Sequence, residues 1–357
     1  MTTEADPTTG PTTEPVAEPV ADRDAGPATS RPTISDVARV SGVSTTTVSH
    51  VLTGKRPVAA STRERVEAAV EQLRYRPSRL ARSLRVGSSQ MIGVVVPDIT
   101  NPFYGQLTRG LADSLGPEYG TWVCNTDGST KRERAYVSDV VTRGADALVM
   151  TSVDASTEAV SVALGSGVPT VCLGESIDHP LVDRVLAADA EASQSAVEHL
   201  LSRGARRIAI IEGPRSLGRS REEGYEHALS SAGLKAPQQL RVHGDWTRVG
   251  GREALLKLMR LPQRPDAVFC ANDLMAIGAL DGLRSLGLRV PDDVRLVGFD
   301  DIEAASLVSP ALTTIANPAY ETGWSAGKLV LDRLLGRHTG SRRTVVLPCR
   351  LIVRETT

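Results

Sequence analysis

Aromatic residues and cysteines are scarce in this chain of 357 residues. Aromatic side chains form 3% of the sequence and hydrophobic residues 41%, so a core must be built mainly from Val, Leu, Ile and Ala. The four cysteines are far apart, and no two have metal-ligand spacing. Each lies in or beside an apolar run, which predicts buried, reduced thiols in a cytoplasmic protein. They are Cys124, Cys172, Cys270 and Cys349.

Long apolar runs and enzyme motifs are missing as well. No run approaches the ~20 residues that a membrane-spanning helix needs, and the N-terminus has no apolar signal region. Residues 323–329 (GWSAGKL) come nearest to a phosphate-binding loop, but they lack one residue between the glycines and a hydroxyl after Lys328. We therefore predict a cytoplasmic protein that is not an enzyme, with no membrane partner, metal or cofactor.

The length predicts two or three domains, and the charge differs sharply between segments. Residues 1–30 carry six acidic side chains and one arginine among Thr, Pro and Ala, so we predict a disordered acidic tail at residues 1–31. Residues 32–87 carry ten basic and four acidic side chains, a net charge of +6. Such a segment is typical of proteins that bind phosphate backbones, although charge alone also fits an ordinary solvated surface.

The start of this basic segment has the pattern of a helix-turn-helix. Residues 33–36 (TISD) resemble a capping box that opens a first helix, and Gly42 can end it in a left-handed conformation. Ser44 follows after one residue and can cap a second helix. Two short helices joined by so tight a turn are typical of a helix-turn-helix. A third helix is predicted over residues 62–74, capped near Ser61.

The second helix has an unusual outer face. In SGVSTTTVSHVL (residues 41–52) the apolar residues Val48, Val51 and Leu52 share one side of the helix. The other side carries only short polar groups that can donate hydrogen bonds. In a helix-turn-helix this helix enters the major groove, where short hydroxyls can approach base edges closely. The alternative, a three-helix bundle that does not bind DNA, explains neither this face nor the basic charge.

The stretch ISDVARVSGVSTTTVSHVLTGKRPVAASTRERVEAAVEQLRYRPSRLARSLR resembles the DNA-binding head of the LacI–GalR family of bacterial transcription regulators, in particular a purine-responsive member. The resemblance implies a helix-turn-helix domain at residues 32–76 and a hinge helix and linker at residues 77–89, with Leu84 wedged into the minor groove. Many members have Arg where this chain has His50, which affects the preferred half-site. The implied DNA-binding residues are Thr33, Ser44, Thr45, Thr46, Thr47, Ser49, His50, Arg79, Arg82 and Leu84.

From Met91 onward, short apolar runs alternate with helix-length segments. The runs MIGVVVPD, TWVCNTD, DALVMTS, PTVCLGE, RIAIIEG, DAVFCAND and VRLVGFDD read as buried strands, each followed by a helix. This alternation predicts parallel sheets with helices on both faces. Polar residues follow the ends of the strands, where α/β sheets bind ligands. We therefore expect an α/β core of two parallel-sheet subdomains with a ligand cleft between them.

This remainder resembles the effector-binding core of the same family, which is periplasmic-binding-protein-like. The matching stretches are PDITNPFYGQL, RSREEGYEHAL, ANDLMAIGAL, VPDDVRLVGFDD and SPALTTIANP. The resemblance implies that residues 90–357 form two interleaved subdomains that bind a small molecule and dimerise. GDWT (residues 244–247) is similar to a stretch of a sugar-responsive member whose tryptophan lines the sugar site. Asn317 stands where many members have Gln.

Seven effector-binding residues follow from this resemblance, several with an alternative reading. Asn272 and Asp273 could instead cap the helix that they begin, and Asp300 could cap a loop. Arg221 could be a solvated arginine at a helix start, Phe103 could belong to the core, and Trp246 could be either a ligand platform or core. Glu175 and Ser152 are weaker candidates. The residues are Phe103, Ser152, Arg221, Trp246, Asn272, Asp273 and Asp300.

The sequence thus predicts a dimeric, DNA-binding transcription regulator, in this family usually a repressor. It would bind a palindromic operator in double-stranded DNA, and a small molecule, expected to be a sugar, would control it allosterically. A soluble sugar-binding or transport module is a rival hypothesis, but the basic head argues against it. An α/β enzyme is another, but no nucleophile, base or metal set supports it.

Overall fold

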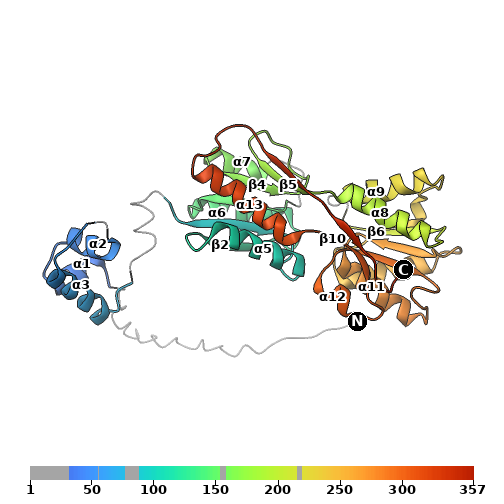
Figure 1. Cartoon of the computed structure of the whole chain (residues 1–357), viewed down its shortest axis with the longest axis horizontal. Coiled ribbons are helices and arrows are strands. Elements are labelled where there is room, and N and C mark those ends of the chain that lie inside the picture. The colour runs from blue at the N-terminus through green and yellow to red at the C-terminus, as the bar shows by residue number, and fades with distance from the viewer. Residues whose placement is uncertain (1–31, 55, 77–87, 153–157, 215–218) are drawn as a thin grey trace, which may run out of the picture. The chain divides into compact units, whose positions relative to one another are not determined.

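The computed structural model describes residues 32–54, 56–76, 88–152, 158–214 and 219–357. The chain separates into two compact units, Met1–Ala81 and Arg82–Thr357, and each is described by itself (Figure 1). The predicted acidic tail and residues 77–87 of the predicted hinge lie outside the described residues. No described helix is long and apolar enough to cross a membrane.

The first unit contains the predicted helix-turn-helix. Its helices are α1 (Ile34–Ser41), α2 (Thr45–Thr53) and α3 (Ala60–Gln72). Thr33 and Asp36 form the capping box, and Gly42 ends α1 at a left-handed φ of 67°. Ser44 caps α2 by accepting a hydrogen bond from the Thr47 backbone N–H at 3.1 Å. One apolar side of each helix forms the core, whose buried members are Val37, Ala38, Val48, Val51, Val66 and Ala69.

The third helix differs from the prediction at both ends. It begins at Ala60 rather than residue 62, and Ser61 lies inside its first turn, so the predicted serine cap is wrong. The carbonyl of Ala59 accepts the first backbone hydrogen bonds, and the preceding residue, Val58, packs on the head core. Arg74, predicted as helical, has a left-handed φ of 49° and ends the segment.

The second unit contains two six-stranded sheets. The first has the order β11-β5-β4-β3-β1-β2, and all its strands are parallel. We call it, with its helices, the N-terminal subdomain. Its strands are β1 (Met91–Val96), β2 (Gly120–Asn125), β3 (Ala147–Met150), β4 (Thr170–Leu173), β5 (Asp183–Ala187) and β11 (Thr344–Leu347). Its helices are α5 (Pro102–Leu115), α6 (Thr130–Thr142), α7 (Glu158–Gly165) and α13 (Ala319–Leu334).

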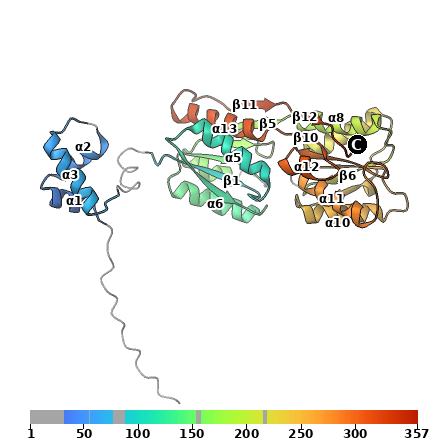
Figure 2. The same ribbon diagram turned by 60° about the horizontal axis from the view of Figure 1, so that its bottom comes forward.

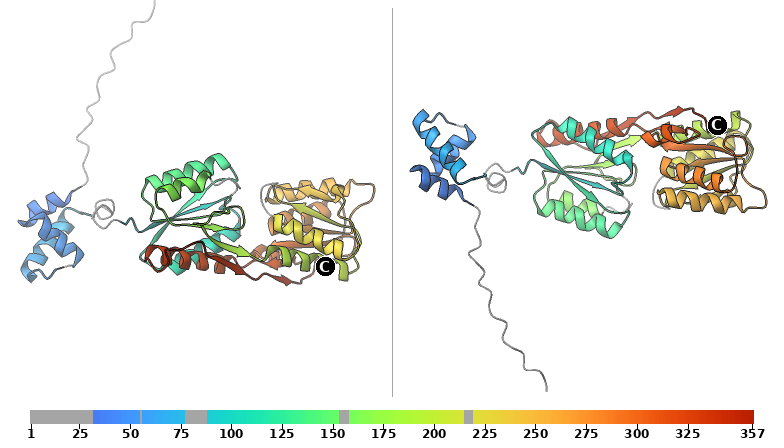
Figure 3. Two further views of the ribbon diagram at one scale, coloured as in Figure 1. Left: turned by 90° about the horizontal axis from the view of Figure 1, so that it is seen from above. Right: turned by 90° about the horizontal axis from the view of Figure 1, so that it is seen from below.

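The second sheet, with its helices, forms the C-terminal subdomain. Its order is β12-β10-β9-β8-β6-β7, and only β12 is antiparallel to its neighbour. Helices cover both faces of each sheet, as predicted (Figure 3). The strands are β6 (Ile208–Glu212), β7 (Arg241–His243), β8 (Ala267–Cys270), β9 (Arg295–Asp300), β10 (Thr313–Ala316) and β12 (Arg350–Ile352). The helices are α8 (Asp189–Ser202), α9 (Arg219–Ser231), η1 (Gln238–Leu240), α10 (Arg248–Met259), α11 (Asp273–Ser285) and α12 (Glu303–Leu307).

The chain crosses between the subdomains three times, after β5, β10 and β11. Helix α13, late in the sequence, therefore lies beside α5 in the N-terminal subdomain (Figures 1 and 2). Glycines allow the two backbones to approach: a Cβ at Gly323 would lie 1.9 Å from the Leu107 carbonyl oxygen. All three crossings must adjust if the subdomains rotate relative to one another.

All seven predicted strands are present, but five others were not predicted. Strand β4 is followed directly by β5 rather than by a helix, so that part of the expected alternation is wrong. The missed strands are short and polar or lie at sheet edges, and they are β5, β7, β10, β11 and β12.

Candidate DNA-binding face and ligand site

The first turn of α2 presents an uncharged polar surface. Thr45 and Thr46 are exposed there, and the turn has no acidic residue. The hydroxyls of Ser44 and Thr47 share a hydrogen bond of 2.9 Å, which holds both at the start of the helix. Because a helix start leaves backbone N–H groups free, this end of α2 suits phosphate oxygens and base acceptors alike.

The other predicted DNA-binding residues have more mixed surroundings. Ser49 and His50 are half-buried on α2. The hydroxyl of Thr33 donates to the Asp36 carboxylate at 2.8 Å and accepts from the Asp36 backbone N–H at 3.3 Å, so its established role is to cap α1. Arg79, Arg82 and Leu84 lie outside the described residues.

The head also has exposed arginines. Arg56, Arg65, Arg74 and Arg76 are exposed, and none has an ion-pair partner within the part of the head that the structure describes. Arg39 pairs with an acid, Asp36, at 3.2 Å on the surface. Unpaired exposed guanidinium groups are suited to nucleic-acid phosphates.

Arg221, on the first turn of α9, is the centre of the candidate ligand site. Its Nε donates to Asp189 at 3.0 Å, and its Nη1 donates to the Ala271 carbonyl. Its Nη2 lies 3.6 Å from the Asp300 carboxylate. The guanidinium also lies 3.7 Å from the ring centre of Phe299. Burial works to lower the pKa of Arg221, but Asp189 and Asp300 outweigh it and raise the pKa, so the group stays charged.

Asp300 closes β9 with an unusual backbone. Its φ of 112° lies in a region that L residues rarely adopt, which indicates that the surrounding contacts fix the side chain in place. The Asn317 amide donates to its carboxylate at 3.2 Å. Burial raises the pKa of Asp300 to about 6, although Arg221 and Asn317 work in the opposite direction.

Two buried acceptor atoms at this cluster have no donor among the residues that the structure describes. They are Oδ1 of Asp189 and Oδ1 of Asn317. A buried polar atom without a partner costs about 1–3 kcal/mol, so such an atom usually bonds to a water molecule or a ligand. The cluster can therefore accept hydrogen bonds from a donor-rich molecule.

Aromatic rings lie at the edge of the same cluster. Trp246 is half-buried, and its ring centre lies 5.8 Å from the Arg221 guanidinium. Phe103, also half-buried, contacts Tyr104 edge-on at 5.3 Å at the start of α5. Burial raises the pKa of the Tyr104 hydroxyl, and the negative charge of Asp300 raises it further. Tyr104 belongs to the N-terminal subdomain and Asp300 to the C-terminal subdomain, so this electrostatic interaction runs between the two.

Three other predicted ligand residues make hydrogen bonds within the protein, and their role in ligand binding stays a prediction. Asn272 caps α11 through Met275 and donates to the Trp246 carbonyl at 3.0 Å. Both carboxylate oxygens of Asp273 accept hydrogen bonds, from the Thr314 hydroxyl and the Ile302 N–H. Burial raises the pKa of Asp273 well above its usual value. The third residue is Ser152, whose hydroxyl donates to the Glu133 carboxylate at 2.7 Å. All three side chains are almost completely buried.

Three residues of the cluster were not predicted as ligand residues, and one of them, Phe299, lies inside the predicted strand VRLVGFDD. Asp189 follows a strand that was not predicted, so nothing marked it as a strand end. Tyr104 is adjacent to the predicted Phe103 and could have been found from the same stretch. Glu175, the weaker candidate, accepts a hydrogen bond of 2.6 Å from the Ser220 hydroxyl at the start of α9, which links the two subdomains.

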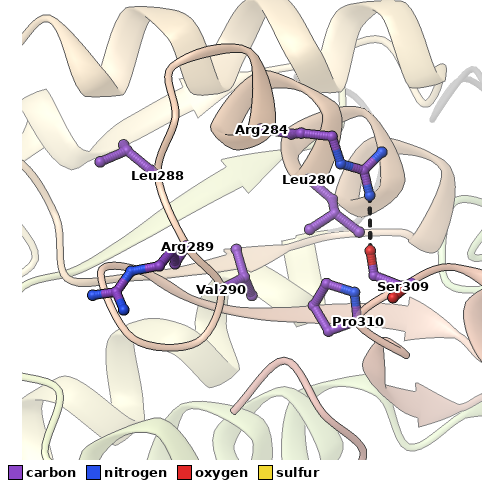
Figure 4. Close-up of a pocket in the computed structure, with 7 residues that line it drawn as sticks. All are labelled: Leu280, Arg284, Leu288, Arg289, Val290, Ser309 and Pro310. Carbon is purple, nitrogen blue, oxygen red and sulfur yellow. Dashed lines mark hydrogen bonds between the residues drawn. The ribbon is translucent and has the colours of Figure 1, made fainter.

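A separate hollow of about 230 Å³ lies on the C-terminal subdomain and contains none of these ligand-site residues (Figure 4). Arg284 donates to the Ser309 carbonyl at 2.8 Å at one side of it. Most of its wall is aliphatic. The lining residues are Leu280, Arg284, Leu288, Arg289, Val290, Ser309 and Pro310.

The cysteines are all free, as predicted, although Cys124 and Cys349 are half-buried rather than buried. Burial raises the pKa of Cys172 to about 11 and that of Cys349 to about 12. Thiols with such values remain protonated near neutral pH and are poor nucleophiles.

The chain is similar to known regulators over most of its length. Residues 33–78 match the model for bacterial regulatory proteins of the lacI family, and residues 197–357 match a periplasmic binding protein-like domain. The ribose operon repressor of Escherichia coli (strain K12) is 37% identical over 311 residues, which cover 86% of this chain and 93% of that protein.

Solved structures of regulators are also similar to this chain. The lac repressor dimer bound to operator and the anti-inducer ONPF has a TM-score of 0.79 and 28% identity, covering 91% of this chain and 99% of that chain. The transcriptional regulator CelR in complex with cellobiose has a TM-score of 0.70 and 31% identity, covering 92% of this chain and 100% of that chain.

These similarities confirm the predicted fold class, a helix-turn-helix head followed by a periplasmic-binding-protein-like α/β core. They also confirm the resemblance to the LacI–GalR family that the head and core motifs predicted. The chain belongs to the LacI family of bacterial regulatory proteins and is a DNA-binding transcription regulator.

Proposed function

We propose that this regulator is a repressor that binds a palindromic operator as a homodimer and responds to an uncharged sugar. The observation that carries the ligand assignment is the cluster of Arg221, Asp300 and the two unpartnered acceptors of Asp189 and Asn317. Sugar hydroxyls are the donors that such acceptors lack. The ribose operon repressor and the cellobiose complex, both relatives, support this class of effector.

Charge balance favours a neutral ligand over an anionic one. Arg221 faces two carboxylates, Asp189 and Asp300, and two of its nitrogens already donate to protein oxygens. The positive charge of Arg221 is thus already paired, so a phosphate or carboxylate group would bind as an uncompensated charge. The free-energy cost of such binding grows with burial. The rings of Trp246 and Phe103 supply apolar surface of the kind that sugar C–H groups pack against.

In the head, the proposed base-reading groups are the exposed hydroxyls of Thr45 and Thr46, with Ser49 and His50 farther along α2. Thr33, Ser44 and Thr47 lie at helix starts, where they would serve phosphates. From the family resemblance we propose Arg79 and Arg82 for phosphates and Leu84 for the minor groove. Two heads on one operator double these contacts, which explains why the site is palindromic.

A homodimer would bury aliphatic surface near the hollow in Figure 4. Leu286 and Leu307, which neighbour its lining residues in sequence, are 47% and 74% exposed. Exposed aliphatic side chains beside an aliphatic hollow are typical of a surface that a second subunit covers. The lac repressor, a relative of the same fold, has been solved as a dimer.

The three crossings couple the ligand to the head. A sugar held by Arg221 of one subdomain and Tyr104 of the other would favour one relative orientation of the subdomains. That orientation would set the spacing of two hinge segments, with a coupling free energy of about 1–3 kcal/mol.

The proposed limits are residues 32–76 for the head, 77–89 for the hinge and 90–357 for the core. Because its proposed target is DNA, we place the protein in the cytoplasm. We propose no catalytic role for it.

The ligand class is tested by calorimetry with matched sugars. Neutral aldoses and disaccharides are titrated into the full chain beside their phosphate esters and aldonic acids. We expect binding by at least one neutral sugar and none by its anionic partners. Tighter binding of an anionic form would overturn the proposed ligand class while leaving the DNA-binding role intact.

A further inference from the structure

Residues 1–31 are a part of this chain that the family does not account for. The lacI family model begins at residue 33, and the alignment with the cellobiose regulator covers all of that chain but 92% of this one. The segment has six acidic side chains, at Glu4, Asp6, Glu14, Glu18, Asp22 and Asp24, against two arginines. A charge of this sign directly before a DNA-binding head opposes the charge that the head needs.

The head has a surface of complementary charge. Residues 32–76 carry seven basic and four acidic side chains. Among the head residues that the structure describes, Arg56, Arg65, Arg74 and Arg76 are exposed and without an ion-pair partner. These are the groups available to phosphates when DNA binds, and they are equally available to carboxylates when it does not.

The acidic segment is joined directly to the head by the chain. The segment ends at Arg31, two residues before Thr33 caps α1. A chain of that length can extend to roughly 100 Å, which is more than enough to reach any face of so small a head. A tethered partner has an effective concentration in the millimolar range, so even weak ion pairs are occupied part of the time.

We propose that residues 1–31 bind the exposed arginines of the head in an intramolecular contact and compete with DNA phosphates for them. This inference rests on the DNA-binding role of the head. Both nonspecific and operator binding must displace the segment from these arginines, so the contact lowers both affinities by about the same factor. The segment therefore weakens DNA binding without changing the preference of the regulator for its operator.

Salt gives this competition a specific signature. Salt weakens the contact between the acidic segment and the head as well as the contact with DNA. The segment therefore suppresses DNA binding most at low salt, and the apparent affinity of the full chain falls less steeply with salt than that of a chain without the segment. The two affinities converge at high salt.

The test compares the full chain with a variant lacking residues 2–31, using fluorescence anisotropy with a scrambled duplex and with a selected operator. At about 50 mM salt, we expect removal to strengthen both nonspecific and operator binding roughly 3- to 10-fold. A second variant, with the six acids replaced by Asn and Gln, should match the truncated chain. A third, with the residues of the segment in scrambled order, should match the full chain.

A peptide of residues 1–31 distinguishes contact with the head from simple repulsion of DNA. Added at millimolar concentration to the truncated chain, it should weaken nonspecific binding, whereas the neutralised peptide should not. Equal affinities of the full and truncated chains at every salt concentration, or no effect of the acidic peptide, would overturn the proposal. Failure of every variant to bind any DNA would instead contradict the DNA-binding role itself.

Discussion

The guanidinium of Arg221 and the carboxylate of Asp300 form an ion pair of 3.6 Å in which both side chains are almost completely buried. Asp189 holds the same guanidinium from another side at 3.0 Å. A buried pair of this kind gives little net stability, since each charge loses its hydration. The pair fixes a charged, directional set of hydrogen-bonding groups, which are the groups proposed to bind the ligand.

Replacing Arg221 by lysine should separate the ligand site from DNA binding. Lysine keeps the charge, so Asp189 and Asp300 remain compensated, but it lacks the planar fork that bonds several groups at once. We expect sugar affinity to fall at least about 10-fold, as loss of one charge-assisted hydrogen bond would give. Operator affinity without sugar should stay the same. Calorimetry with the sugar and anisotropy with the operator measure the two quantities.

Arg260→Lys is the matched control, because Arg260 is exposed at the end of α10. It should leave both affinities unchanged. If Arg221→Lys also binds sugar as the parent does, Arg221 is not part of the ligand site.

Sugar binding should depend on pH through Asp300. Its pKa of about 6, raised by burial, means that the carboxylate is charged above pH 6 and protonated below it. A sugar hydroxyl donates to the charged form, so affinity should be constant at neutral pH and fall as pH decreases through 6, by at most about 10-fold per pH unit. Asp300→Asn should bind weakly with no such slope. A parent affinity that stays constant down to about pH 5 would exclude Asp300 as the acceptor.

The two kinds of contact in the head should respond differently to mutation. Thr45→Ala removes a group that reads bases, so operator binding should weaken by about 1–3 kcal/mol and scrambled-duplex binding should not change. Arg65→Gln removes a phosphate contact, so both duplexes should bind less tightly and the salt dependence should decrease. Anisotropy titrations over a range of salt measure all four affinities. Equal losses on both duplexes for Thr45→Ala would contradict its role in reading bases.

The contact between α5 and α13 should be intolerant of any side chain at Gly323. An added Cβ would lie 1.9 Å from a backbone oxygen, which cannot move without separating the helices. We expect Gly323→Ala to lower the free energy of unfolding by at least about 1–3 kcal/mol, measured by denaturant titration. Gly105→Ala, in open space on α5, is the control and should stabilise the helix by about 0.5–1 kcal/mol. Similar effects at both positions would mean that the contact is not tight.

The sequence was most informative where local chemistry decides the structure. The capping box at Thr33, the left-handed Gly42 and the cap at Ser44 fixed two helices and their turn, because each acts within a few residues. Continuous apolar runs identified the central strands for the same reason. Strand β11 pairs with β5 from more than 150 residues away, and its residues alternate between exposed and half-buried, so nothing local marks it.

The ligand site was predicted less completely. Arg221 and Asp300 came from the family resemblance, and the rule that ligands bind at strand ends indicated the edge of the sheet where the cluster around Arg221 lies. That rule does not give side-chain direction: Asp273 and Asp300 both follow this edge, yet Asp273 is bonded inside the core and Asp300 faces Arg221. Asp189 enters the site from a chain crossing, a feature of tertiary structure that no local pattern shows.

The most direct test of the account is the effect of a bound sugar on operator affinity. Duplexes selected from a random pool by the full chain are titrated with protein, with and without the neutral sugar that calorimetry identifies. We expect a palindromic sequence to be selected and the sugar to change its affinity about 5- to 150-fold while leaving a scrambled duplex unaffected. A sugar that binds the protein but leaves operator affinity unchanged would contradict the account.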